Sequence, residues 1–228
     1  MPGRDIPLVT GQTYHVVNRG IASQPIFTHA HDYQRALDTV FFYQNVHPPL
    51  RYSYFKRLPP KERKEILDSL KKEGDFLVDV LAYCLMPNHI HLLLVQQEER
   101  GISLFMSQVA NSYTKYFNTI RKRKGPIFQG KFKAVRIETD EQFLHISRYI
   151  HLNPYTSYVV KKLDQLERYP YSSFAEFLGI RSTNFCDKTV ILANFSSKAS
   201  YKSFVYDQAD YQRELEKIKH LTLETLEN

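Results

Sequence analysis

The chain has 228 residues, 43% of them hydrophobic and 24% charged, a composition typical of one globular domain with an extension or of two small domains. No apolar run approaches the roughly 20 residues that cross a bilayer, and the first residues lack the apolar block of a signal peptide, so we expect neither membrane insertion nor export. Cys84 and Cys186 lie far apart and suggest neither a zinc site nor a disulfide framework, which favours a reducing cytoplasm.

The charge balance is basic, with 31 Lys and Arg against 24 Asp and Glu and a formal net charge of +7. Such a surplus favours polyanions as partners, but it does not distinguish nucleic acid from an anionic membrane or from plain solubility. Aromatic residues make up 14% of the chain, all of them Phe and Tyr. Many must belong to the core, and others could stack on unpaired bases.

The first predicted element is a strand at residues 12–18, where side chains alternate between two faces. Tyr14 and Val16 fall on one face, and His15 and Val17 fall on the other. Apolar residues at helical spacing then predict a helix from about residue 32 to residue 45.

A charged segment at residues 58–74 predicts a helix that two prolines open and Gly74 closes. Its apolar residues are few, so we interpret it as an exposed insertion. Two apolar runs follow at 76–86 and 89–95, separated by Pro87-Asn88. They predict neighbouring strands of a buried antiparallel sheet.

Apolar residues at helical spacing predict another amphipathic helix at 103–121, followed by an extended region or hairpin at 127–137. A further helix is expected at 140–153, with Asp140 as its N-cap and Pro154 enforcing its end. A last helix is expected at 211–220. This order of elements indicates an α+β domain with helices packed on an antiparallel sheet.

The sharpest local feature is His89-Ile90-His91, which lies within a predicted strand. Side chains two residues apart on a strand project from the same face, with Cα atoms about 7 Å apart. Neighbouring imidazoles are common ligands of divalent metal ions. Two histidines that are merely exposed would give the same pattern, so the pattern alone leaves both interpretations open.

The helix at 140–153 offers a third ligand. Tyr149 and Asn153 are four residues apart and therefore share one helix face, and Gln142 and His145 lie on the same stripe. A polar stripe of this kind is usually the solvent face of a helix. The alternative is that the amide of Asn153 completes a site of two imidazoles and one oxygen, with positions left open for phosphate oxygens and water.

Several segments in this order resemble the tyrosine-type HUH transposases, and in particular the REP-associated tyrosine transposases. They are CLMPNHIHLLL at 84–94, GPIFQGKFKAVRIE at 125–138 and RYIHLNP at 148–154, supported by Tyr14-His15, Arg19-Gly20 and YPYSS at 169–173. No one of these motifs is specific by itself, but the combination is. The resemblance implies a ferredoxin-like or RRM-like antiparallel sheet flanked by helices over residues 1–180. Residues 58–74 would be a helical insertion, and residues 181–228 a C-terminal extension.

The resemblance also implies an activity: cleavage and transfer of single-stranded DNA at hairpin-forming repetitive palindromic elements. The metal ligands would be His89, His91 and Asn153, the ion Mg²⁺ or Mn²⁺, and Tyr149 the nucleophile that forms a 5′-phosphotyrosine. Relatives with Gln in place of Asn153 make an amide at this position chemically reasonable. The chain departs from the family in the length of its insertion, and in Tyr169 and Tyr171, which stand where relatives often carry Trp.

Other side chains are candidates for supporting roles. A phenol with a pKa of about 10 is a poor nucleophile near neutral pH, so His145, one turn before Tyr149, is a possible assistant; a histidine satisfied on the helix surface is the alternative. Tyr113 and Tyr116 could also act as nucleophile, although their place on an apolar stripe favours core packing. The densest basic region would either follow the DNA backbone or form solvated surface; it comprises Arg121, Lys122, Arg123, Lys124, Lys131, Lys133 and Arg136.

Two other functions compete with the nuclease. A non-catalytic nucleic-acid-binding module could use the same fold, but binding alone would not require the set of His89, His91, Tyr149 and Asn153. A hydrolase of small phosphoesters is the third possibility, although a histidine-triad hydrolase needs another His where Leu93 stands. Whether the active unit is a monomer or a homodimer is not decided by the sequence.

Overall fold

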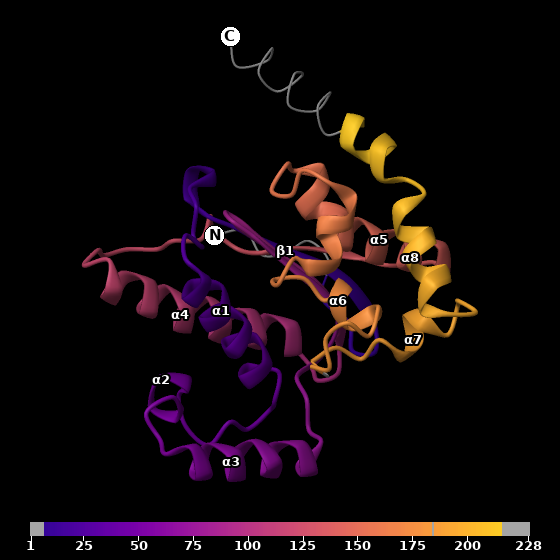
Figure 1. Ribbon diagram of the computed structural model, residues 1–228. Helices are drawn as coiled ribbons and strands as arrows, with labels where there is room; N and C mark the ends of the chain where they lie inside the picture. The colour runs from indigo at the N-terminus through magenta and orange to yellow at the C-terminus, as the bar shows by residue number, and fades with distance from the viewer. Residues whose placement is uncertain (1–6, 184, 216–228) are drawn as a thin grey trace.

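The computed structural model describes residues 7–183 and 185–215. The described residues form a four-stranded antiparallel sheet with strand order β2-β3-β1-β4 (Figure 1). The α+β class is therefore confirmed, and the fourth strand supplies the extended segment predicted at 127–137. The strands are β1 (Thr13–Arg19), β2 (Val78–Met86), β3 (His89–Gln96) and β4 (Lys133–Arg136).

One face of the sheet carries a layer of two helices that pack against each other, α1 (Ala30–Tyr43) and α4 (Gly101–Ile120) (Figure 1). Their apolar side chains meet residues such as Val16 and Leu92, which are fully buried in a core on this side. Tyr113 belongs to the same core, and its hydroxyl donates to the carbonyl of Ile26 at 2.6 Å. The core interpretation of Tyr113 is thus confirmed.

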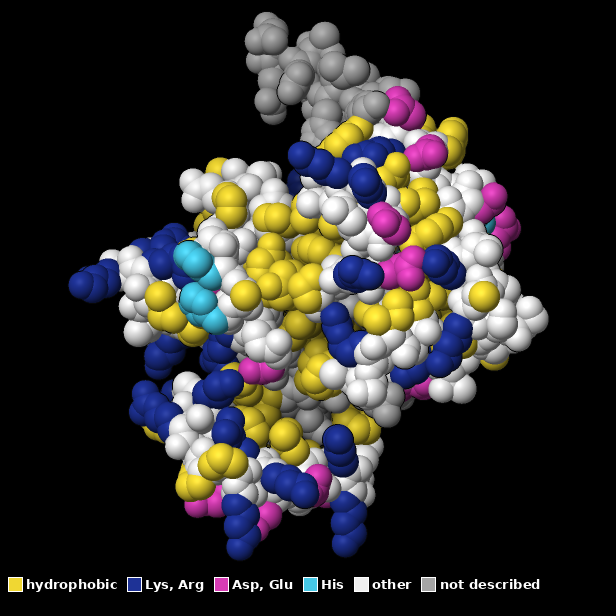
Figure 2. All heavy atoms as spheres, viewed as in Figure 1, with side chains coloured by type: hydrophobic (Ala, Val, Ile, Leu, Met, Phe, Trp, Pro, Cys, Tyr) yellow, Lys and Arg dark blue, Asp and Glu magenta, His cyan; other side chains and the backbone are white. Residues whose placement is uncertain are grey.

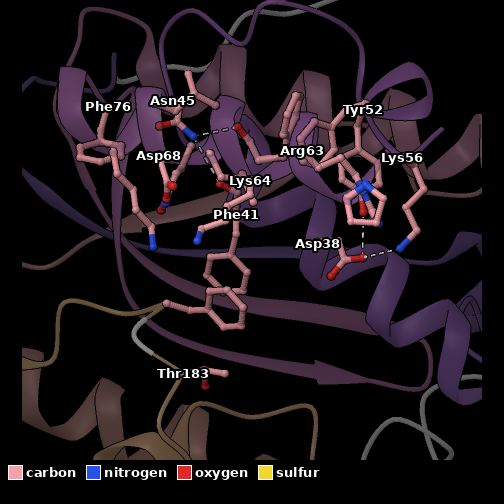
Figure 3. Close-up of a pocket in the computed structure, with 18 of the residues that line it drawn as sticks. Asp38, Phe41, Asn45, Tyr52, Lys56, Arg63, Lys64, Asp68, Phe76 and Thr183 are labelled. Atoms are coloured by element: carbon pink, nitrogen blue, oxygen red, sulfur yellow. Dashed lines mark hydrogen bonds and ion pairs between the residues drawn. The ribbon is translucent and has the colours of Figure 1, made fainter. Parts of the chain in front are cut away.

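The charged segment that the sequence predicts as an insertion forms α3 (Pro60–Glu73), beside the short helix α2 (Tyr52–Phe55). As predicted, Gly74 ends α3; its φ of 71° is a left-handed conformation that glycine adopts without steric cost. Leu70 is the side chain that α3 buries, so its contact with the core is small. Between α1, α2, α3 and the residues Ser182, Thr183 and Phe185 lies a pocket of about 840 Å³ (Figure 3). Asp38 accepts hydrogen bonds there from Tyr52 and Lys56.

The other face of the sheet is covered by α5 (Asp140–Thr156), and α8 (Lys198–Tyr206) packs against α5 (Figure 1). A second buried core forms between these helices and the sheet, and Cys84 lies in it as a fully buried small side chain, as predicted. The remaining short elements are η1 (Ile21–Ser23), η2 (Leu163–Arg168), α6 (Phe174–Phe177) and α7 (Thr189–Leu192).

Both predicted ends of α5 were wrong by a short distance. Its N-cap is Thr139 rather than Asp140, and the Thr139 side chain accepts a hydrogen bond from the backbone N–H of Gln142 at 3.1 Å. The helix also continues through Pro154 to Thr156. A proline removes one backbone donor from a helix, and here the burial of Tyr155 and Thr156 beyond it outweighs that loss.

Near the C-terminal end of the described chain, residues 209–215 are helical, in agreement with the helix expected at 211–220; residues 216–220 lie outside the described residues. None of the described helices is both long and apolar enough to span a membrane. Figure 2 shows Lys and Arg side chains gathered at the tip beyond α4 and along α3.

Candidate active site

The register of the sheet gathers histidines on the face that α5 covers. In the pairing of β1 with β3, Arg19 stands opposite His89 and Val17 stands opposite His91. Directly opposed residues of an antiparallel pair project from the same face. His15 therefore shares this face with the two histidines of β3, although sequence reasoning did not select it as a site residue.

His91 is buried at 4% exposure, and its two ring nitrogens have different surroundings. Nδ1 lies 2.9 Å from Nε2 of His15, whereas Nε2 is buried and has no hydrogen-bond partner among the described residues. Burial lowers the pKa of His91 well below 6.5 and lowers that of His15 to about 4. Both imidazoles are therefore neutral near pH 7, the form in which histidine binds a metal.

His89 completes the pair on β3. Its ring centroid is 4.7 Å from that of His91, and its Nδ1 lies 2.6 Å from Oδ1 of Asn88. Burial and, to a smaller extent, the charge of Arg19 lower the pKa of His89 to about 4, and a side-chain hydrogen bond with Asn153 opposes this shift. The hydrogen bond with Asn88 orients the ring of His89 and occupies Nδ1, so Nε2 is the ring nitrogen that could bind a ligand.

α5 brings Tyr149 and Asn153 to the same place. The Tyr149 ring meets the rings of His91 and His15 edge to face, with centroids 5.5 and 5.9 Å apart. Asn153 is 3% exposed, and its Nδ2 donates to the carbonyl of Tyr149 at 3.0 Å, so the amide oxygen is its remaining strong polar group. The structure thus gathers all four residues that the motifs singled out: His89, His91, Tyr149 and Asn153.

His151 fixes how α5 is turned toward the sheet. It is fully buried on the side of α5 away from Tyr149 and Asn153, with Nε2 2.8 Å from the hydroxyl of Ser173 and Nδ1 2.8 Å from that of Tyr201. Burial lowers its pKa to about 3. Both nitrogens of a neutral ring are thereby satisfied, which allows the imidazole to be buried and anchors the helix.

The structure does not join His145 to this group. Its Nδ1 lies 2.6 Å from Nη2 of Arg148, and its Nε2 lies 3.7 Å from a carboxylate oxygen of Glu141. Its ring meets Phe204 of α8. The histidine whose ring contacts Tyr149 is instead His15. The alternation of side chains along β1 predicts that His15 and Tyr14 lie on opposite faces, but the sequence alone does not predict which strand pairs with β1.

The basic residues that the sequence offered for DNA binding differ in whether their side chains are bonded within the protein or exposed to solvent. The guanidinium of Arg121 binds the fully buried carboxylate of Asp32 at 2.6 Å, so it links α4 to α1. Arg136 donates to Gln12, and Arg123 donates to the carbonyl of Pro126. Lys133 pairs in register with Val17 and therefore lies on the face of the candidate site. The side chains of this set that remain exposed to solvent are those of Lys122, Arg123, Lys124, Lys131, Lys133 and Arg136.

Tyr116, the other alternative nucleophile, lies on α4 and donates its hydroxyl to Asp32 at 3.0 Å. α4 packs on the opposite face of the sheet from α5. Neither Tyr116 nor Tyr113 is therefore near the histidine pair.

With this geometry established, comparisons with known proteins define the class. The family model described as IS200-like transposase matches residues 9–153, which is more than half of the chain and includes His15, His89, His91, Tyr149 and Asn153. The protein belongs to the IS200-like transposase family. A search of curated proteins found no match.

One solved structure agrees with the family at the level of the fold. A REP-associated tyrosine transposase bound to a REP hairpin aligns with a TM-score of 0.50 and 16% identity, over 78% of this chain and 86% of that one. A protein of Deinococcus radiodurans R1 that was provisionally assigned as a transposase aligns with a TM-score of 0.33 and 15% identity, over 66% of this chain and 95% of that one. The predicted resemblance to REP-associated transposases is thus confirmed, and so is the sheet architecture it implied.

Proposed function

We propose that this transposase-family protein is a metal-dependent endonuclease and strand transferase that acts on single-stranded DNA through Tyr149. The observation that carries the proposal is the position of the Tyr149 ring, whose centroid is 5.5 Å from that of the buried His91 ring. Nε2 of His91 has no hydrogen-bond partner among the described residues. Buried polar atoms are normally satisfied. An unsatisfied nitrogen beside a phenol therefore points to a ligand that binds between them.

A divalent cation fits the donors that meet here. Among the described residues no group of three or more His, Cys, Asp or Glu side chains could hold a metal ion, and the amide oxygen of Asn153 would provide a ligand of another residue type. We propose His89, His91 and Asn153 as the ligands of Mg²⁺ or Mn²⁺; when bound, the ion supplies Lewis-acid polarisation of the scissile phosphate. Two imidazoles suit Mn²⁺ at least as well as Mg²⁺.

The reaction that these residues can perform is a transfer of the phosphoryl group to tyrosine. The phenolic oxygen of Tyr149 loses its proton and forms a bond to phosphorus, while the bond from phosphorus to the 3′ oxygen breaks. The 3′ oxygen takes up a proton, leaving a 3′-hydroxyl and a 5′-phosphotyrosine. The reverse attack by another 3′-hydroxyl joins a new strand without an outside energy source, because the phosphoester bond is conserved.

We propose hairpin-forming repeats as the DNA, on the support of the structural similarity to a transposase bound to a REP hairpin. Exposed lysine side chains lie where they could contact the phosphates of such a substrate. Lys133 extends from the edge strand on the face of the site, and Lys122 and Lys124 follow α4. We further propose that residues 1–180, with the insertion at 58–74, are the catalytic part and that residues 181–228 are an extension.

The test is covalent capture of labelled single-stranded DNA hairpins by the full chain with Mn²⁺, resolved by denaturing electrophoresis. Tyr149→Phe should abolish the protein–DNA band and leave hairpin affinity within about twofold, since it removes one oxygen. Tyr54→Phe is the matched control, because Tyr54 is 57% exposed on α2. Capture by the Tyr149→Phe variant at the wild-type level would refute the proposal, and hairpin binding without any capture by the wild type would favour a binding module.

A further inference from the structure

We propose that His15 is a positioning residue. It accepts a hydrogen bond from Nδ1–H of His91 and thereby keeps Nε2 of His91 unprotonated, as the lone pair that faces a divalent cation. The inference rests on the proposed function, because that function makes His91 a metal ligand. Neither the motifs nor the family match assigns a role to His15.

The geometry is that of an in-plane hydrogen bond. The ring planes of His15 and His91 differ by 14°, and their centroids are 5.2 Å apart. Nε2 of His15 and Nδ1 of His91 are 2.9 Å apart, which is shorter than the ~3.5 Å contact of ring atoms that merely touch. The two rings therefore lie edge to edge, and one N–H points along the lone pair of the other ring.

Two tautomers satisfy this contact, and they have opposite consequences. If His15 donated, Nδ1 of His91 would be the acceptor, and the proton of His91 would sit on Nε2. That N–H would be buried without an acceptor among the described residues, and it could not bind a cation. If His91 donates from Nδ1, its Nε2 carries the lone pair. A bound cation selects the second arrangement, and His15 makes it available beforehand.

The surroundings of His15 support an orienting role. Its ring contacts both His91 and Tyr149, so one side chain borders a ligand and the nucleophile at once. His89 has its own orienting partner in Asn88, 2.6 Å from Nδ1. Histidine ligands commonly donate their second ring N–H to a neighbouring acceptor, and loss of such a partner lowers metal affinity about 10–100-fold. In each histidine of the pair, Nδ1 is thus held by a neighbour, Asn88 for His89 and His15 for His91.

The test measures Mn²⁺ binding to the DNA-free full chain by electron paramagnetic resonance, together with long-range proton–nitrogen spectra of the imidazole rings without metal. His15→Phe keeps an aromatic ring but removes the acceptor, and should lower Mn²⁺ affinity about 10–100-fold. His15→Gln places an amide near the position of Nε2 and should restore most of the affinity. His47→Phe makes the same chemical change at an exposed residue before α2 and should have no effect.

In the wild type, the ring spectra should show His91 protonated at Nδ1. A His91 protonated at Nε2, or a folded His15→Phe variant with unchanged Mn²⁺ affinity, would overturn the inference. If His15→Phe does not fold, the wild-type ring spectra and the His15→Gln variant still decide it. A wild type that binds no Mn²⁺ but shows Nδ1–H in His91 would refute the proposed metal site while leaving the hydrogen bond to His15 established.

Discussion

Arg121 offers a sharp test of what the basic segment after α4 does, because its guanidinium is already bound within the protein. The Arg121 side chain is 23% exposed, and its Nη2 lies 2.6 Å from a carboxylate oxygen of Asp32, which is 0% exposed. Asp32 also accepts from the N–H and hydroxyl of Thr28, from the N–H of His29 and from Tyr116. We therefore expect Arg121→Met to affect folding stability rather than DNA affinity.

The size of the effect follows from these interactions. Removing one partner of a buried ion pair costs about 3–5 kcal/mol of unfolding free energy. The other hydrogen bonds to Asp32 remain, which favours the lower end of that range. The variant also lacks the cation–π interaction of the guanidinium with the Phe117 ring, at 4.0 Å, worth about 0.5–1 kcal/mol. The expected decrease in stability is about 3–4 kcal/mol.

Urea unfolding followed by circular dichroism measures this decrease, and hairpin affinity at several salt concentrations measures the interaction with DNA. Lys124→Met is the comparison, because Lys124 is exposed in the same segment. For each phosphate of single-stranded DNA that a variant no longer neutralises, the slope of log affinity against log salt should flatten by about 0.7. If Arg121→Met changed the salt slope and cost less than about 1 kcal/mol of stability, the reasoning from its ion pair would be refuted.

Two further predictions concern stability. Burial lowers the pKa of His151 to about 3, so below about pH 6.5 the unfolded chain binds a proton that the folded chain does not. The metal-free protein should therefore lose stability as the pH falls from 7 to 5. The slope of the unfolding free energy against pH should approach about 1.4 kcal/mol per pH unit for this group. Burial also lowers the pKa of His15, His89 and His91, so the total slope should be steeper than the share of His151; urea titrations across that interval measure it, and a flat profile would contradict the burial of neutral rings. Gly101 begins α4, and an added Cβ would overlap the carbonyl of Leu77. Gly101→Ala should thus cost about 1–3 kcal/mol, and a thermal midpoint equal to that of the wild type would show that the backbone there yields easily.

The sequence predicted those parts of the fold that depend on local patterns. Alternation and helical spacing located β1 to β3 and the helices α1, α3, α4 and α5, but not α8, and the spacing of Tyr149 and Asn153 placed both on one face of α5. The ends of α5 could not be predicted, because continuation through Pro154 depends on the burial of Tyr155 and Thr156 in a tertiary core. Patterns of neighbouring residues in the sequence do not contain information on that tertiary packing.

The part of the site that sequence reasoning missed depends on pairing between distant strands. His15 reaches His91 because β1 lies between β3 and β4 in a register that places Val17 opposite His91. His145 was chosen for its nearness along the helix, yet its contacts are to Arg148 and Glu141. The ion pair of Arg121 with Asp32 likewise joins two helices that are far apart in the sequence. Long-range partners of this kind decide the role of a side chain, and a single sequence does not contain them.

The anchoring of α5 has a consequence for how the chain can be divided. His151 is bonded on one side to Ser173 and on the other to Tyr201, so the helix that carries the proposed nucleophile is gripped by residues from both sides of position 180. A protein truncated there would expose one nitrogen of His151 and lose the packing of α8. The described residues after position 180 therefore hold α5 in place beside the proposed site, and replacing one part of the chain with that of a relative, without the other, should misalign Tyr149.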